Sequence, residues 1–224
     1  MISLKAASNI KGLGKPAPRR ALTPSRLPHV IPHVRKLIPE LADRCHVIAS
    51  GHIGYGFSDG PPVNEYEYSF ENLTAATLVL LDKLGIRSFA VYIHDYGASI
   101  GLRTASRHPG RVTALLVQSD NAYLEGFAAL WDIRFAHAED RAAAAAARKK
   151  RAHLTPEKTH WPYTHGVPAD RLDRVDPSTW TRDQTLTDRP GSKEVQLQLF
   201  RTTSSTCPPT LNSRSNSASV SRRH

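Results

Sequence analysis

The chain has 224 residues, of which 40% are hydrophobic and 22% are charged, a composition typical of a folded globular protein. No apolar run approaches the roughly 20 residues that a membrane-spanning helix needs. Two cysteines, Cys45 and Cys207, are too few for a disulfide framework, and no Cys/His spacing indicates a metal site. These features exclude a collagen, a coiled coil, a zinc finger and a small disulfide-rich secreted protein.

The net charge of +10 is concentrated at the two ends of the chain. Residues 1–39 contain eight Lys or Arg and residues 201–224 contain four Arg, and neither segment contains an acidic residue. Basic ends can bind a phosphate backbone, so a nucleic-acid binder is one alternative. The same composition is typical of disorder, and the leader also has the acid-free character of a transit peptide. We favour disordered or non-native ends and expect no nucleic-acid partner and no membrane association.

Regular patterns begin near Arg35 in this sequence. The end of a helix is predicted at Lys36–Leu41 and a short strand at His46–Ala49. A turn-rich loop follows at Gly51–Gly60, and an amphipathic helix at Ser69–Leu84. Ser69 is a suitable first cap of the last helix and Gly85 a suitable stop.

A strand–helix–strand unit is predicted next. Phe89–Ile93 and Val112–Gln118 are apolar runs typical of buried parallel strands, and Ala98–Arg107 between them has a helical pattern. This βαβ unit places the chain in the α/β class with a parallel sheet. After Asn121 the α/β pattern stops and only helices are predicted, among them Phe127–Phe135, Glu139–His153 and Glu194–Phe200.

The turn after the first of these strands, Ile93–Ala98, carries the strongest candidate for chemistry. Asp95 lies two residues past the strand, and Gly97 and Ala98 are small enough for the following helix to pass close by. A carboxylate at a helix N-terminus is kept ionised, as a carboxylate nucleophile must be. The simpler alternative is an aspartate that only caps the helix.

Ser99 offers a competing interpretation, because Gly97–Gly101 matches the G-x-S-x-G pattern of serine hydrolases. That pattern requires the strand to run directly into its first glycine. Here His-Asp-Tyr intervenes, so Ser99 is predicted to lie one turn inside the helix. We therefore favour Asp95 over Ser99 as nucleophile.

Several segments together resemble the α/β-hydrolase fold family, in particular the branch of epoxide hydrolases and haloalkane dehalogenases with an aspartate nucleophile. The resemblance runs almost continuously from Lys36 to Phe200. It rests on the glycine-rich loop at Gly54–Asp59 and the strand–helix turn at Ile93–Ala98. It also includes the helix end and strand at Arg107–Leu115 and the helical segment at Tyr123–Phe200. It implies a parallel sheet with a helical lid, in which Asp95 is the nucleophile.

The mechanism implied by this resemblance has two steps. Asp95 attacks a substrate carbon and forms an alkyl ester, and a water activated by a histidine then hydrolyses the ester. The backbone N–H of Tyr96 would be one oxyanion or halide donor. Dehalogenases usually have Trp at that position. Tyr96 therefore favours an epoxide as the substrate, and a haloalkane is the alternative substrate.

The resemblance also implies further site residues. Lid tyrosines polarise the epoxide oxygen in this branch, and Tyr163 is the first candidate, with Tyr123 second. Asp120 is the candidate acid that orients the catalytic histidine, although the family's acid can also be aligned with Ser119. We expect His94, Tyr123 and Trp161 to line the substrate pocket.

Two parts of the family pattern are missing from the sequence. The H-G-x-P oxyanion loop is replaced by Thr23–His33, and no strand precedes His224 at the position of the family's catalytic histidine. A one-base shift in a possible coding sequence for Ser25–His33 would read His-Gly-Phe-Pro, and a two-base shift in Arg201–Asn212 would continue the lid. We therefore expect a frameshifted, incomplete hydrolase whose turnover is impaired, or an inactive remnant.

The expected organisation is a non-native or disordered basic leader at residues 1–34, a hydrolase core at 35–122, a helical lid at 123–200 and a disordered or out-of-frame tail at 201–224. We expect no cofactor and no metal, a small apolar epoxide or halide as substrate, and a cytoplasmic location. The sequence does not indicate an oligomeric state.

Overall fold

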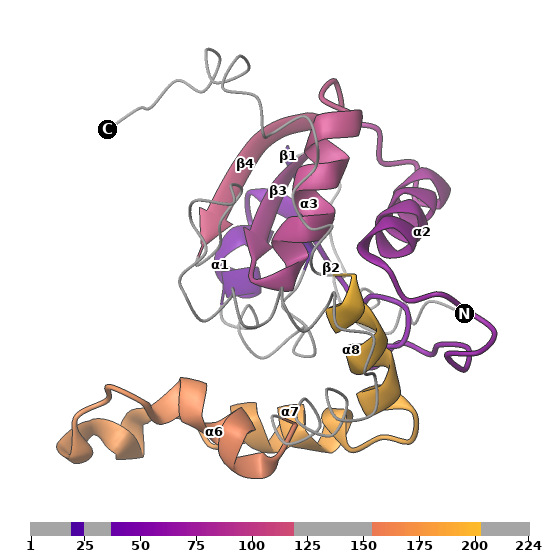
Figure 1. Cartoon of the computed structure of the whole chain (residues 1–224). Coiled ribbons are helices and arrows are strands. Elements are labelled where there is room, and N and C mark those ends of the chain that lie inside the picture. Colours follow the sequence, from indigo (N-terminus) through magenta and orange to yellow (C-terminus); the bar gives the residue numbers. More distant parts are fainter. Residues whose placement is uncertain (1–18, 25–36, 119–153, 203–224) are drawn as a thin grey trace, which may run out of the picture.

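The core of the molecule is a four-stranded parallel sheet (Figure 1). The computed structural model describes residues 19–24, 37–118 and 154–202. The strands are β1 to β4 in chain order, at Arg19–Pro24, Cys45–Ser50, Phe89–His94 and Val112–Gln118. Their order across the sheet is β2-β1-β3-β4. Parallel neighbours require crossover connections, and the α/β fold class predicted from the sequence is therefore confirmed.

The position of β1 differs from the expectation that regular structure begins near Arg35. This strand pairs with β2 on one side and with β3 on the other, so Ala21 is opposite both Val47 and Ala90. The segment Arg19–Pro24 reads RRALTP and contains a single leucine. It therefore lacks the apolar run that indicates a buried strand from sequence. Its pairing with both neighbours places the start of the sheet upstream of the predicted boundary.

The remaining elements of the core agree with the predicted pattern. Helices α1, α2 and α3 lie at Leu37–Ala42, Phe70–Lys83 and Tyr96–Arg107. The Ser69 side chain caps α2 by accepting a hydrogen bond from the Asn72 N–H at 3.2 Å. Gly85 follows α2 with a φ of +66°, a conformation that glycine adopts without strain. The predicted strand–helix–strand unit is confirmed as β3, α3 and β4.

Two clusters of buried side chains hold these elements together. The first joins β3 to α2 and α3 through Val91, Ile93, Leu81 and Leu102. The second lies between the glycine-rich loop, α2, α3 and the C-terminal helix, and contains the buried residues Tyr55, Tyr68, Phe70, Leu73, Ile100, Val195 and Leu199. Because the second cluster includes Val195 and Leu199, residues far along the chain are fixed against the N-terminal half of the fold.

The described helices after residue 153 are α6, α7 and α8 at Pro156–Thr164, Ser178–Thr187 and Ser192–Arg201, with a 3₁₀ helix, η2, at Ala169–Arg174. Figure 1 shows α6 and α7 below the sheet, with α8 rising from them towards it. The helix predicted at Glu194–Phe200 is confirmed as part of α8. The helices predicted at 127–135 and 139–153 lie outside the described residues. No described helix has the length and hydropathy needed to cross a bilayer.

The strand β4 was predicted to be buried, and this prediction is wrong for the described structure. Leu115, Leu116 and Val117 are 40%, 51% and 54% exposed. Among the described strands, β4 pairs only with β3, so it forms one edge of the sheet. An apolar run therefore indicated the strand correctly but not its burial, which depends on what lies over it.

The difference in burial can be tested with two leucines. We expect Leu81→Ala to lower the free energy of unfolding by about 2–5 kcal/mol, because Leu81 is fully buried and its loss leaves a cavity. Leu116→Ala should cost less than about 1 kcal/mol, because that side chain is half exposed. Urea denaturation followed by circular dichroism measures both. Equal losses would contradict the assignment of the core.

Candidate active site

The backbone at Asp95 has an unusual conformation. Asp95 lies between the last residue of β3 and the first residue of α3, with φ 51° and ψ −132°. Among the described residues it is the one non-glycine with a positive φ. Such backbone strain is concentrated at functional sites and is a feature of the sharp strand-to-helix turn that presents a nucleophile above a sheet.

The side chain of Asp95 does not cap α3. It is at the N-cap position, but it makes no capping hydrogen bond, and the turn is closed by its backbone carbonyl, which accepts from the Ala98 N–H at 2.9 Å. A capping aspartate would instead accept from N–H groups of the first turn. The alternative in which Asp95 only caps the helix therefore lacks its defining interaction.

The close packing of α3 on β3 depends on Gly101. A Cβ atom at this position would lie 2.3 Å from the Ile93 Cγ2 atom and 3.2 Å from the Val91 Cγ1 atom. The sequence analysis singled out Gly97 and Ala98 for this close approach and missed Gly101. The signal was present, because Gly101 lies on the same face as Gly97 at a spacing of four residues.

Ser99 lies inside α3 and is not at the turn. Its residue is 6% exposed, and its carbonyl oxygen accepts a hydrogen bond from the Arg103 guanidinium at 2.8 Å. The match of Gly97–Gly101 to the serine-hydrolase pattern is explained by packing, since the second glycine is required for contact with β3. This placement agrees with the preference for Asp95 as nucleophile.

Tyr96 connects the turn to α2 and α8. Its ring centroid lies 5.7 Å from that of Phe70 and 5.7 Å from that of Phe200. Aromatic contacts of this geometry fix the position of the ring. The residue after Asp95 is therefore held between the core and the end of the last described helix, which would orient its backbone N–H, the predicted oxyanion donor.

The side chain of Tyr163 contacts α7. Its hydroxyl donates a hydrogen bond to Oδ2 of Asp183, which is fully buried, and its ring lies 6.0 Å from that of Trp180. Both partners are in α7. The described arrangement thus gives Tyr163 a part in packing α6 on α7. A role as proton donor to a substrate requires this hydroxyl to leave Asp183.

The remaining residues predicted for the site are His94, Trp161, Asp120 and Tyr123. His94 is the last residue of β3, directly before Asp95. Trp161 is 56% exposed and stacks on the His165 ring at 4.1 Å, so the described residues do not enclose it in a pocket. Asp120 and Tyr123 lie outside the described residues.

The sequence analysis missed one buried polar residue, His52. It follows β2 in the glycine-rich loop, is 3% exposed, and its Nε2 atom has no hydrogen-bond partner in the part of the chain that the structure describes. Burial lowers the pKa of His52 to about 4, so its imidazole is neutral at pH 7. The only sequence signal was a histidine two residues after a strand.

A sequence model of the alpha/beta hydrolase fold family matches residues 27–215. The chain belongs to this family. The strand order, the strand–helix turn at Asp95 and the glycine-rich loop after β2 now have a common explanation, and the resemblance stated from the sequence is confirmed at the level of the family.

Relatives and solved structures support the same assignment. This hydrolase-fold chain is 36% identical over 176 residues to an uncharacterized hydrolase of Saccharomyces cerevisiae, an alignment that covers 74% of this chain and 57% of the yeast protein. It is 36% identical over 81 residues to a haloalkane dehalogenase of Agrobacterium fabrum, which covers 36% of this chain and 26% of that protein. A candidate epoxide hydrolase from Pseudomonas aeruginosa superposes with a TM-score of 0.65 at 21% identity, covering 84% of this chain and 64% of the other.

These coverages have a consequence for function. The chain spans less than two thirds of the length of each of these three proteins. The superposition at 21% identity shows a shared fold and no more. The activity of a complete hydrolase is therefore a matter for proposal and test.

The contact between Gly101 and Ile93 gives a sharp prediction. We expect Gly101→Ala to lower the free energy of unfolding by about 1–3 kcal/mol, because its methyl group would overlap Ile93 and force α3 away from β3. Gly110→Ala is the matched control, since a Cβ there meets nothing within 4 Å. Thermal and urea denaturation measure both, and an unchanged Gly101→Ala protein would show that the contact is not close.

The buried imidazole of His52 predicts a dependence of stability on pH. The folded pKa of about 4 lies below the unfolded value of 6.5, so the folded state binds fewer protons between these values. The contribution of the neutral His52 imidazole to the free energy of unfolding is present above pH 6.5. It is lost as the pH falls towards 4, and the loss is roughly 3 kcal/mol. We expect His52→Asn to flatten the stability profile in this range. His46→Asn, at an exposed position of β2, is the control and should leave the profile unchanged.

Proposed function

We propose that this chain is a hydrolase that acts on a small apolar epoxide through Asp95 as nucleophile. The observation that carries the proposal is the strained backbone of Asp95 at the turn between β3 and α3. Strain at a residue that does not cap its helix indicates that the carboxylate is presented for another purpose. The name of the dehalogenase relative adds support for a carbon-centred substitution.

The first step forms an ester on Asp95. A carboxylate oxygen bonds to one epoxide carbon while the bond between that carbon and the epoxide oxygen breaks, and the released oxygen takes a proton from a donor in the site. Tyr163 and Tyr123 are the proposed donors, and Tyr163 would have to release Asp183 to act. The Tyr96 backbone N–H is the proposed oxyanion donor during ester hydrolysis.

The second step returns the carboxylate. Water adds to the ester carbonyl, the diol leaves and Asp95 is regenerated, with Asp120 proposed to orient the histidine that takes the proton from water. We assign no residue as that histidine. Where no base acts on the ester, the first step still proceeds and the ester on Asp95 accumulates.

A haloalkane is the alternative substrate, and the same attack would then release a halide ion. The fragment shared with the Agrobacterium dehalogenase favours it. The tyrosine at position 96 disfavours it, because a phenol held between two aromatic rings, Phe70 and Phe200, supplies no indole N–H for the halide. An epoxide and a bromoalkane of the same carbon skeleton therefore distinguish the two substrates.

The test is covalent labelling of the protein by styrene oxide. We expect intact mass spectrometry to show one equivalent of adduct, and peptide mapping to place it on Asp95. The Asp95→Asn variant should lose this adduct, since an amide is a far weaker nucleophile. Ser99→Ala should keep it, because Ser99 lies inside α3.

Each outcome of this experiment has a defined meaning. An adduct that persists in Asp95→Asn and disappears in Ser99→Ala would overturn the assignment of the nucleophile. The absence of any site-specific adduct in the unmodified chain would favour an inactive remnant. Steady formation of diol with loss of activity in Asp95→Asn would support Asp95 and show that a base is present.

A further inference from the structure

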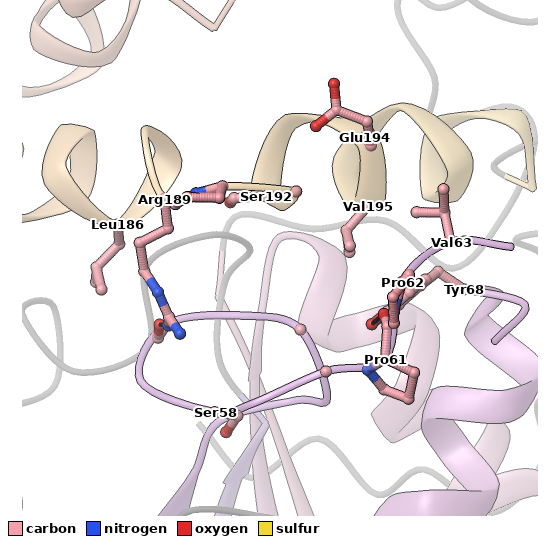
Figure 2. A pocket seen from close by; sticks show the side chains of 15 residues that line it. Ser58, Pro61, Pro62, Val63, Tyr68, Leu186, Arg189, Ser192, Glu194 and Val195 are labelled. Atoms are coloured by element: carbon pink, nitrogen blue, oxygen red, sulfur yellow. Dashed lines mark hydrogen bonds between the residues drawn. The ribbon is translucent and has the colours of Figure 1, made fainter. Parts of the chain in front are cut away.

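A hollow in the described part of the structure lies apart from Asp95. It is a cleft of about 440 Å³ between the glycine-rich loop and the junction of α7 with α8, and Asp95 does not line it. Figure 2 shows the loop on one side and the two helices on the other. A volume of this size is within the range of sites that hold small molecules.

Much of the cleft surface is apolar. Pro61, Pro62 and Val63 contribute the loop side, and Leu186 and Val195 contribute the helix side. Figure 2 shows the Val195 side chain directed from α8 towards the loop. These side chains would remove a short alkyl or aryl group from water, which is favourable by about 25 cal/mol for each Å² of apolar surface.

The positive charge in the cleft comes from Arg189. Its guanidinium extends from the helix junction across to the loop, where it donates a hydrogen bond to the Gly56 carbonyl oxygen at 2.5 Å (Figure 2). No ion pair joins Arg189 to a described carboxylate. Glu194 also lines the cleft, but Figure 2 shows its carboxylate directed away from the loop. Since a guanidinium has five N–H donors, this arginine can bind a further acceptor.

Ser192 lies three residues after this arginine in the sequence. It lines the cleft, is 8% exposed, and donates its backbone N–H to the Arg189 carbonyl at 3.0 Å. Of the charged residues nearby in the sequence, Lys193 pairs with Asp188 at 2.6 Å and leaves Arg189 to other partners. The Arg189 guanidinium and Ser192 therefore share with the apolar side chains a cleft that is also lined by Glu194.

We propose that this cleft binds a small monocarboxylate with a short apolar tail. The planar guanidinium of Arg189 matches a carboxylate in shape and charge, and the Ser192 hydroxyl would supply a second donor. The apolar tail would lie against Pro61, Val63 and Val195. A neutral ligand would leave the charge of Arg189 without a partner, so the site distinguishes acids from amides of the same size.

The test compares hexanoate with hexanamide by isothermal titration calorimetry. We expect hexanoate to bind at least about tenfold more tightly than hexanamide, the difference expected of a charge-assisted pair. Arg189→Gln should weaken hexanoate binding by about the same factor. Arg182→Gln is the matched control, since Arg182 lies over the Phe57 ring at 5.9 Å and does not line the cleft. Arg182→Gln should leave the affinity unchanged.

The comparison of the two ligands uses the unaltered chain, so it remains decisive if Arg189→Gln is poorly folded. Equal affinities for hexanoate and hexanamide, or no binding of hexanoate, would overturn the proposal. Binding that is lost in Asp95→Asn but kept in Arg189→Gln would assign hexanoate to the Asp95 site and would also overturn it. Labelling of Asp95 by styrene oxide is independent of these results, so the two proposals can fail separately.

Discussion

The contact of α3 with β3 at Gly101 and Ile93 is the constraint on which the candidate active site depends. The helix can approach the strand only because Gly101 lacks a Cβ atom, which would lie 2.3 Å from Ile93. With the strand and the helix in contact, the connection between them must turn sharply, and Asp95 takes up the strain with its positive φ. The conformation of Asp95 is therefore a consequence of packing at residues two positions before it and six positions after it.

Packing around α8 joins the later helices to the N-terminal half of the fold. Val195 and Leu199 join a buried cluster with residues of the glycine-rich loop and α2, and the Tyr68 N–H donates to the Gln198 side chain at 2.8 Å. Arg189 adds a hydrogen bond from the helix junction to the loop. These contacts link parts of the chain that are about 130 residues apart. The same loop and helix junction line the cleft.

Buried polar groups show where the fold departs from simple apolar packing. The Tyr163 hydroxyl donates to Oδ2 of the buried Asp183 carboxylate between α6 and α7. His52 instead remains neutral within the loop after β2, with its pKa lowered to about 4. Unsatisfied buried polar atoms cost about 1–3 kcal/mol each, so their retention requires tight packing elsewhere in the fold.

Periodicity and turn residues were sufficient to predict β2, α2, β3, α3, β4 and α8, since each is a local apolar pattern bounded by glycine, proline or a capping residue. The sequence also determined the position of Asp95 at a strand–helix turn, because strand, turn and helix are adjacent in the chain. It did not determine β1, the exposure of β4 or the burial of His52. Those depend on contacts between residues distant in sequence, and only the tertiary structure brings such residues together.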